Sequence, residues 1–203
     1  MKKTIKEAVL IEHEINKSKF LSYLAPVKTE DEAKEYLREI KRLHPKATHH
    51  CSAYVCGDIE RSNDDGEPAS SAGLPMLQVL RGNDLDFVIA VVVRYYGGVL
   101  LGVGGLIRAY GSSVSLALEA ATIMVPSTVY TYTLTFPYEF TNEVETHLTS
   151  SGVIVDREYD ALAKYTVEVL SETILDDLND FTSGTIVIES QGSRIDYKEE
   201  VSL

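Results

Sequence analysis

The chain has 203 residues, a formal net charge of −12 and an apolar content of 44%, which is ordinary for a soluble globular protein. This length accommodates one large domain or two small ones. No window approaches the roughly 18 to 20 apolar residues that a membrane span requires. Glu7, Glu12 and Glu14 interrupt the apolar positions of the N-terminus, so the sequence predicts neither a membrane anchor nor a signal peptide.

The negative charge is unevenly distributed. Residues 1–126 hold 15 Lys+Arg and 16 Asp+Glu, whereas residues 127–203 hold 4 and 15. The second region therefore carries nearly all of the net charge and would repel nucleic acid or an anionic membrane at long range. Only the first region is expected to offer an anion site, as a local patch.

The first elements predicted along the chain are a β-hairpin and a helix. The hairpin is predicted from two apolar segments on either side of a turn at residues 16–18. The second segment covers 20–27, and the first consists of odd-numbered apolar residues: Ile5, Val9, Ile11 and Ile15. Thr29 and Glu32 form a capping box that predicts a helix start, and His44-Pro45 predicts its end.

The middle of the chain alternates strands with glycine-rich and polar loops. Residues 48–56 predict a strand, with Cys51, Ala53 and Val55 on one face. The polar segment 57–73 predicts a loop, and residues 74–80 predict a short helix. Seven apolar residues, 87–93, predict a buried strand, which leads through a glycine-rich connection to a helix over 104–121.

Pro126 and Ser127 mark the predicted boundary between two domains, residues 1–126 and 127–203. The second domain reads as β-α-β-β-α-β, the ferredoxin-like split arrangement, so the chain is predicted to be α+β. Its elements are strand 129–136, helix 138–150, strands 153–159 and 164–170, helix 172–182 and strand 185–190. The last dozen residues are expected to be a frayed tail.

The glycine-rich connection is the first candidate site. Five glycines lie between Arg94 and Arg108: Gly97, Gly98, Gly102, Gly104 and Gly105. A strand, a glycine turn and a helix N-terminus beside two cations can hold an anion. However, Ile107 breaks the dinucleotide fingerprint and no phosphate-loop motif occurs. Close packing of the helix on the sheet is the alternative explanation.

Arg108 heads a narrow polar stripe on an otherwise apolar helix: Arg108, Ser112, Ser115 and Glu119. A cation in the first turns opposes the helix dipole, so a negative group nearby would stabilise it. That group is either a ligand or a carboxylate of the protein itself.

The loop that begins at Asp64 is the second candidate site. It holds three carboxylates in four residues, namely Asp64, Asp65 and Glu67, which could bind a hard cation such as Mg²⁺. The residues Asp, Gly and Pro are also natural constituents of a solvated turn, which is the favoured reading. A third possibility is that the carboxylates pair with Arg94 and Arg108 and lock the two loops together.

The cysteines and two adjacent tyrosines are weaker candidates for functional residues. His49 and Cys51 share a strand face but lack the further ligands of a metal site, and a structural, half-buried cysteine is favoured over a nucleophile. Cys51 and Cys56 are roughly 16 Å apart along one strand, beyond disulfide reach, and suit a reducing cytoplasm. Tyr95 and Tyr96 either stack on a ligand or cover the end of the sheet.

Three ordered motifs resemble the signatures of the IMPACT/YigZ family. They are A-T-H-H-C-S-A-Y at 47–54, D-D-G-E-P…A-G at 64–73 and R-Y-Y-G-G-V-L-L-G-V-G-G-L-I-R-A-Y at 94–110. The likeness covers nearly the whole chain. The chain departs from the family pattern at Ser70-Ser71, where Gly-Thr is common, and at Leu74, where a basic residue is common.

The resemblance implies an N-terminal α/β sandwich similar to domain IV of elongation factor G and related ribosomal-protein domains, followed by a domain similar to domain V of that factor. It also implies a link to translation, because the eukaryotic relatives bind a translational activator of a stress kinase. For the bacterial members it implies nucleic-acid binding, on fold similarity alone.

The sequence therefore predicts a non-enzymatic cytoplasmic protein that binds protein or RNA of the translation machinery through its N-terminal domain. The predicted surface contains Asp64, Asp65, Glu67, Arg94, Tyr95, Tyr96, the five glycines and Arg108. No cofactor, metal, membrane contact or DNA sequence recognition is predicted. The alternative is a metal-assisted enzyme acting on a phosphorylated small molecule or nucleotide, with Asp64 and Asp65 on the metal and the two arginines on the phosphate.

Overall fold

The computed structural model describes residues 2–149 and 152–200. The chain divides into two compact units, residues 1–125 with 199–203 and residues 126–198, which we call unit 1 and unit 2. Within the described residues, no helix is both long enough and apolar enough to cross a membrane.

Unit 1 is built on an antiparallel sheet of five strands in the order β2-β3-β6-β4-β5. The strands are β2 (Val9–Ile15), β3 (Ser18–Pro26), β4 (His49–Cys56), β5 (Ile59–Asn63) and β6 (Val88–Tyr95). The central strand is β6, and its first seven residues are all buried, which explains why it reads as a continuous apolar run rather than an alternating one. A short strand, β1 (Thr4–Ile5), precedes the sheet.

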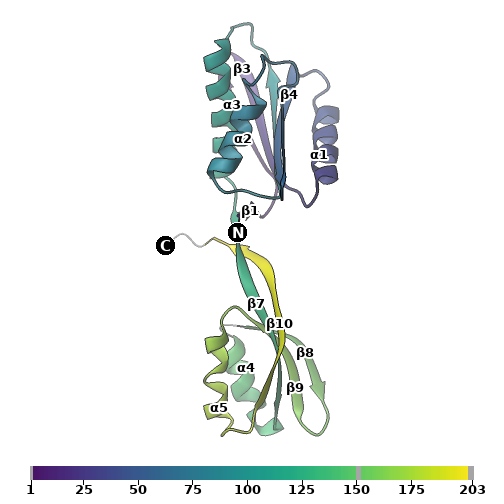
Figure 1. The fold of residues 1–203 in the computed structure, drawn as a ribbon, viewed down its shortest axis with the longest axis vertical. Helices are drawn as coiled ribbons and strands as arrows, with labels where there is room; N and C mark the ends of the chain where they lie inside the picture. The colour runs from purple at the N-terminus through teal and green to yellow at the C-terminus, as the bar shows by residue number, and fades with distance from the viewer. Residues whose placement is uncertain (1, 150–151, 201–203) are drawn as a thin grey trace. The chain divides into compact units, whose positions relative to one another are not determined.

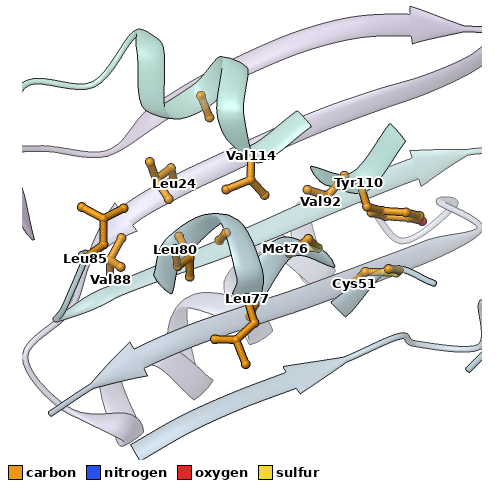
Figure 2. Close-up of a cluster of buried hydrophobic side chains, with 14 of the residues drawn as sticks. Leu24, Cys51, Met76, Leu77, Leu80, Leu85, Val88, Val92, Tyr110 and Val114 are labelled. Carbon is orange, nitrogen blue, oxygen red and sulfur yellow. The ribbon is translucent and has the colours of Figure 1, made fainter. Parts of the chain in front are cut away.

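Helices cover both faces of this sheet (Figure 1). Helix α1 (Glu30–Leu43) lies on one face, and α2 (Gly73–Gly82) and α3 (Gly102–Glu119) lie on the other. Alternate residues of β4 point to opposite faces of the sheet, as predicted. Cys51, Ala53 and Val55 join the core beneath α2 and α3, part of which is shown in Figure 2, while Tyr54 joins the core beneath α1.

Local signals account for the ends of α1. Thr29 caps the helix, because its hydroxyl oxygen accepts a hydrogen bond from the Glu32 amide at 3.2 Å. The Glu32 carboxylate in turn accepts from the Lys28 amide at 2.7 Å, one residue before the cap. The helix ends at His44, as the His-Pro pair predicts.

The β2–β3 hairpin fixes the edge of unit 1 next to the glycine connection. Asn16 and Lys17 both have positive φ, at 46° and 65°, which is the backbone of a tight two-residue hairpin turn. Gly97 lies against this turn so closely that a Cβ atom there would be 1.8 Å from the Lys17 carbonyl oxygen. Only glycine fits at this position.

Unit 2 has the predicted β-α-β-β-α-β order. Its strands are β7 (Ile123–Phe136), β8 (Gly152–Tyr159), β9 (Ala163–Val169) and β10 (Val187–Glu199). Strand β7 is paired with β9 and β10, and β9 is paired with β8. The segments between strands are the 3-10 turn η1 (Tyr138–Phe140) with α4 (Thr141–Thr149), and the 3-10 turn η2 (Glu172–Leu175) with α5 (Leu178–Phe181). One core unites them, centred on Leu134, Phe136 and Tyr165.

Three predictions about elements were wrong. Residues 59–63 form β5 rather than a loop, because this mostly exposed edge strand has no apolar alternation to reveal it. Segment 172–182 is not one helix but η2 followed by α5. Most of the predicted tail belongs to β10, whose pairing with β7 is a long-range contact; residues 201–203 lie outside the described residues.

The predicted domain boundary falls inside a strand. β7 begins at Ile123 and runs past Pro126, and its first residues pair with β1, with Ile123 opposite Ile5. The change in charge balance near residue 126 therefore does not coincide with a break in secondary structure.

Replacement of Gly97 should test the close approach to the hairpin turn. We expect Gly97→Ala to lower the free energy of unfolding by about 3 kcal/mol, the upper end for overpacking, because the Lys17 carbonyl must move. Urea unfolding followed by circular dichroism measures this. Gly98→Ala is the matched control: φ is 85° but nothing lies within 4 Å of its Cβ position, so it should cost only about 1 kcal/mol. Equal losses would show that the contact is unimportant.

Candidate functional site

A row of side chains crosses the sheet of unit 1 at the end that carries the glycine connection. The strand register places His13 opposite Phe20, Phe20 opposite Arg94 and Arg94 opposite His49. The His13 ring stacks on Phe20 at 5.6 Å, and the Arg94 guanidinium lies 5.5 Å from the centre of the same ring. Three of the four row members thus form one stack, which holds Arg94 against the sheet.

Arg94 and Glu67 form a buried ion pair at the centre of the site. Arg94 Nη1 donates to Glu67 Oε1 at 2.6 Å, and the two side chains are only 6% and 4% exposed. Arg94 Nη2 donates to the Ser18 hydroxyl at 3.2 Å, while the Tyr110 hydroxyl donates to Glu67 Oε1 at 2.7 Å. The pair therefore joins β6 and β3 to the acidic loop and to α3.

Because the pair is buried, each of its two charges depends on the other for stabilisation. A charge removed from water costs several kcal/mol unless a partner compensates it. Burial also raises the pKa of Tyr110 far above its usual range, so its hydroxyl keeps its proton and serves as a donor to Glu67. The favoured reading of the acidic loop as a solvated turn was wrong for Glu67, which is buried; the possibility that its carboxylates pair with the arginines holds for Glu67 and Arg94 alone.

The carboxylates of Asp64 and Asp65 accept hydrogen bonds from other parts of the protein, and neither residue lines the cavity described below. Asp64 accepts hydrogen bonds from the amides of Ser70, Ala72 and Gly73 at 2.8–3.0 Å, and so caps the start of α2. Asp65 accepts from the His50 amide and from Lys41 Nζ, at 2.7 and 2.8 Å. Burial alone would raise the pKa of Asp65, but these two donors lower it overall.

His49 and Cys51 anchor the same loop through its backbone. His49 Nδ1 lies 2.9 Å from the Asp65 carbonyl oxygen, and the Cys51 thiol donates to the Asp64 carbonyl at 3.0 Å. Cys51 is fully buried and free, and burial raises the pKa of its thiol to about 12. The structural reading of Cys51 is the one that this geometry supports.

The glycine connection differs from the predicted turn. Helix α3 begins at Gly102, so Gly102, Gly104 and Gly105 lie in its first turn, and only Gly97 and Gly98 lie in the loop. Leu101, the residue at the N-cap position, provides no side-chain hydrogen bond to the helix start. The helix therefore begins two residues before the predicted start at 104, because the segment is helical despite its low helix propensity.

Two predicted members of the site lie apart from it. Tyr95 points to the α1 face, where its hydroxyl contacts His44 Nδ1 at 3.0 Å, because successive residues of a strand face opposite sides. Arg108 is exposed and has no ion pair with any described residue; its guanidinium lies back along the helix near Gly104. The structure does not bring the two arginines together.

A cavity of about 380 Å³ opens beside the ion pair. Its lining combines a polar floor with apolar walls and comes from the three sequence motifs and α3: Thr48, His49, Glu67, Pro68, Arg94, Tyr96, Leu100, Leu101, Gly102, Val103 and Leu106. Tyr96 contacts the floor at one side, where the centre of its ring lies 5.4 Å from the Arg94 guanidinium.

Five exposed apolar side chains between the end of β6 and the start of α3 form what we call the apolar rim: Tyr96, Val99, Leu100, Val103 and Ile107. Tyr96, Leu100 and Val103 line the cavity. Leu100 is 85% exposed and Val103 is 55% exposed. Sequence reasoning placed Tyr96 in the site but missed the other four members of the rim, as well as Ser18 and Tyr110, which form hydrogen bonds with the ion pair. The signal for the rim was weak in the sequence, because Leu100 precedes α3 and Val103 lies on the same helix face as the buried Tyr110, seven residues further along.

Among the described residues, no group of three or more His, Cys, Asp or Glu side chains could hold a metal ion. Leu74, which stands where a basic residue is common in the resembling family, is 37% exposed on α2. The charged groups of the site are thus used within the protein, and the surface that it presents is apolar.

Removal of one partner should expose the cost of the buried pair. We expect Glu67→Gln to lower the free energy of unfolding by about 3–5 kcal/mol, because it leaves the Arg94 charge buried without compensation. The double variant Glu67→Gln/Arg94→Met should recover part of that loss, and chemical unfolding of the four proteins in the cycle measures it. Additive losses would contradict a coupled pair.

The thiols provide a second test. At pH 7.5, neither Cys51 nor Cys56 of the folded protein should react with a thiol reagent on a scale of minutes, because both are buried and burial raises the pKa of Cys56 to about 11. Both should react at once in 6 M guanidinium chloride. Rapid labelling of Cys51 in the native protein would reopen its nucleophilic role.

Comparison with known proteins identifies the relatives of this chain. A sequence profile of the Impact N-terminal domain matches residues 16–118. The IMPACT family member YvyE of Bacillus subtilis is 38% identical over 199 residues, 97% of this chain and 89% of that protein. The IMPACT family member YigZ of Escherichia coli is 37% identical over 187 residues, which cover 88% and 92% of the two chains.

More distant and structural matches agree. Protein IMPACT of Rattus norvegicus is 37% identical over 94 residues, 42% of this chain and 29% of that protein. A crystal structure of a protein described as hypothetical covers 93% of this chain and 97% of its own at 35% identity, with a TM-score of 0.59, and shares its two-domain α+β fold. The chain belongs to the IMPACT family.

Proposed function

We propose that this protein is a non-enzymatic binding protein, acting in the cytoplasm, that contacts a component of the translation machinery through unit 1. The observation that carries the proposal is the apolar rim at the cavity. Its five members are 38–85% exposed, and three of them, Tyr96, Leu100 and Val103, line the same cavity. Gathered apolar exposure of this kind is typical of interaction surfaces.

The disposition of the charged groups supports binding over catalysis. A general acid, base or metal ligand needs a free group with access to substrate. Here Asp64 and Asp65 are occupied by backbone amides and Lys41, Glu67 is occupied by Arg94, and the Cys51 thiol keeps its proton. The enzymatic alternative, with a metal on Asp64 and Asp65 and a phosphate on both arginines, finds no support in this arrangement.

The link to translation comes from the family. The family likeness implies that residues 1–126 are similar to domain IV of elongation factor G and residues 127–203 to domain V, and this expectation motivates a partner on or near the ribosome. The net charge of −12 favours a partner contact confined to unit 1, because acidic unit 2 repels RNA.

Affinity capture from a native bacterial lysate tests the proposal. We expect immobilised wild-type protein to enrich ribosomal proteins, translation factors or ribosomal RNA, and Leu100→Asp to lose at least ten-fold of that enrichment. Leu100 is 85% exposed, so the substitution leaves the core intact, whereas it places a charge in the centre of the contact.

The matched control is Leu116→Asp, which changes an exposed apolar residue of the same protein outside the cavity lining. It should retain the captured partner. Enrichment of no translation component, or an equal loss in both variants, would contradict the proposal; turnover of a phosphorylated metabolite by the purified protein would favour the enzymatic alternative.

A further inference from the structure

We propose that the cavity beside the Arg94–Glu67 pair receives one apolar side chain of a partner protein together with the peptide group that carries it. This inference rests on the proposed function and specifies its partner as a protein segment rather than RNA. Four properties of the cavity support it: its walls, its net charge, its unused hydrogen-bonding atoms and the charges around it.

The walls suit an apolar side chain. Leu100, Leu101, Val103 and Leu106 line one side, and Pro68 and Tyr96 complete the lining. Burial of an apolar side chain against such walls contributes roughly 1.5–3 kcal/mol. Leu100 and Val103 are themselves mostly exposed, so a partner would also cover surface that the protein alone leaves in water.

The polar floor of the cavity contains the Arg94–Glu67 pair, whose charges cancel. The Arg94 charge is balanced by Glu67 at 2.6 Å, inside the protein. An anionic ligand would have to compete with that carboxylate, and a cationic ligand with the guanidinium. A neutral group that forms hydrogen bonds is the occupant that this floor favours.

The hydrogen-bonding atoms left over at the floor are those that a peptide group satisfies. Glu67 Oε1 receives the hydrogen bonds from Arg94 and Tyr110, which leaves Oε2 of this cavity-lining residue to accept from a peptide N–H. Arg94, which also lines the cavity, has a buried Nε with no acceptor among the described residues, and a peptide carbonyl oxygen supplies that acceptor.

The surroundings disfavour RNA. Nucleic acid is held mainly by Lys and Arg contacts to phosphates. Among the residues that line the cavity, Arg94 is the only Lys or Arg, and Glu67 neutralises it. Interface cores between proteins, by contrast, are depleted in charge and rich in apolar and aromatic residues, which matches the rim and Tyr96.

A chemical-shift titration of the full-length, ¹⁵N-labelled protein tests this. The probe is N-acetyl-leucine N-methylamide, which has an apolar side chain and two peptide groups. We expect saturable shifts of the amides of Thr48, Gly102 and Leu106. N-acetyl-serine N-methylamide lacks the apolar side chain and isopentanol lacks the peptide groups, so each should bind at least five-fold more weakly.

Two variants distinguish the cavity from the rest of the surface. Val103→Asp adds a charge to the wall, near the start of α3 where the helix dipole tolerates an acid, and should weaken probe binding at least ten-fold. Leu116→Asp, on the same helix but outside the lining, should stay within two-fold of wild type.

The same titration with tetrauridylate decides the partner class. The inference is overturned if tetrauridylate binds at these amides more tightly than the peptide probe and loses binding in Val103→Asp, or if no probe shifts them saturably. If lysate capture succeeds while the cavity binds no peptide probe, this inference fails alone. If the cavity binds the probe while no translation component is captured, the proposed function fails alone.

Discussion

The buried ion pair between Arg94 and Glu67 is the constraint on which the site depends. Two charges removed from water require close and well-directed partners, or the fold loses several kcal/mol. Ser18 and Tyr110 supply those partners from β3 and α3, so that one interaction ties the central strand, the hairpin, the acidic loop and the helix into a single arrangement. The glycine connection between β6 and α3 then follows a short path over the hairpin turn, where Gly97 meets the Lys17 carbonyl.

In this arrangement, the polar side chains of the site serve structural roles inside the protein, whereas the exposed side chains are apolar. The polar groups that suggest catalysis or metal binding in the sequence are turned inward, where they cap α2, anchor the loop and neutralise one another. What reaches the solvent at the same end of the sheet is an apolar rim. A neutral polar floor below apolar walls discriminates by shape and hydrogen bonding rather than by charge, which is a property of recognition sites for protein segments.

Prediction from sequence succeeded for elements whose own residues show a clear pattern of apolar or capping residues. It failed for elements that form because of their contacts with other parts of the chain. The cap at Thr29, the central apolar strand and the alternation of Cys51, Ala53 and Val55 are local features, and the structure confirms them. Strand β5 and the end of β10 have weak local patterns, because most of their residues are exposed and no apolar alternation marks a buried face. The helical start at Gly102 likewise opposes local propensity.

The sequence by itself indicated that the three motifs contribute to one site, because they lie where strands of the N-terminal domain begin or end, and residues of all three line the cavity. It also determined that Glu67 or its neighbours could meet an arginine. Only the tertiary structure decided which carboxylate does so, that Tyr95 faces away and that Arg108 stays in solvent. The physical reason is geometric: residue types set the chemistry that is possible, whereas strand register and helix packing set which atoms lie within 3 Å of one another.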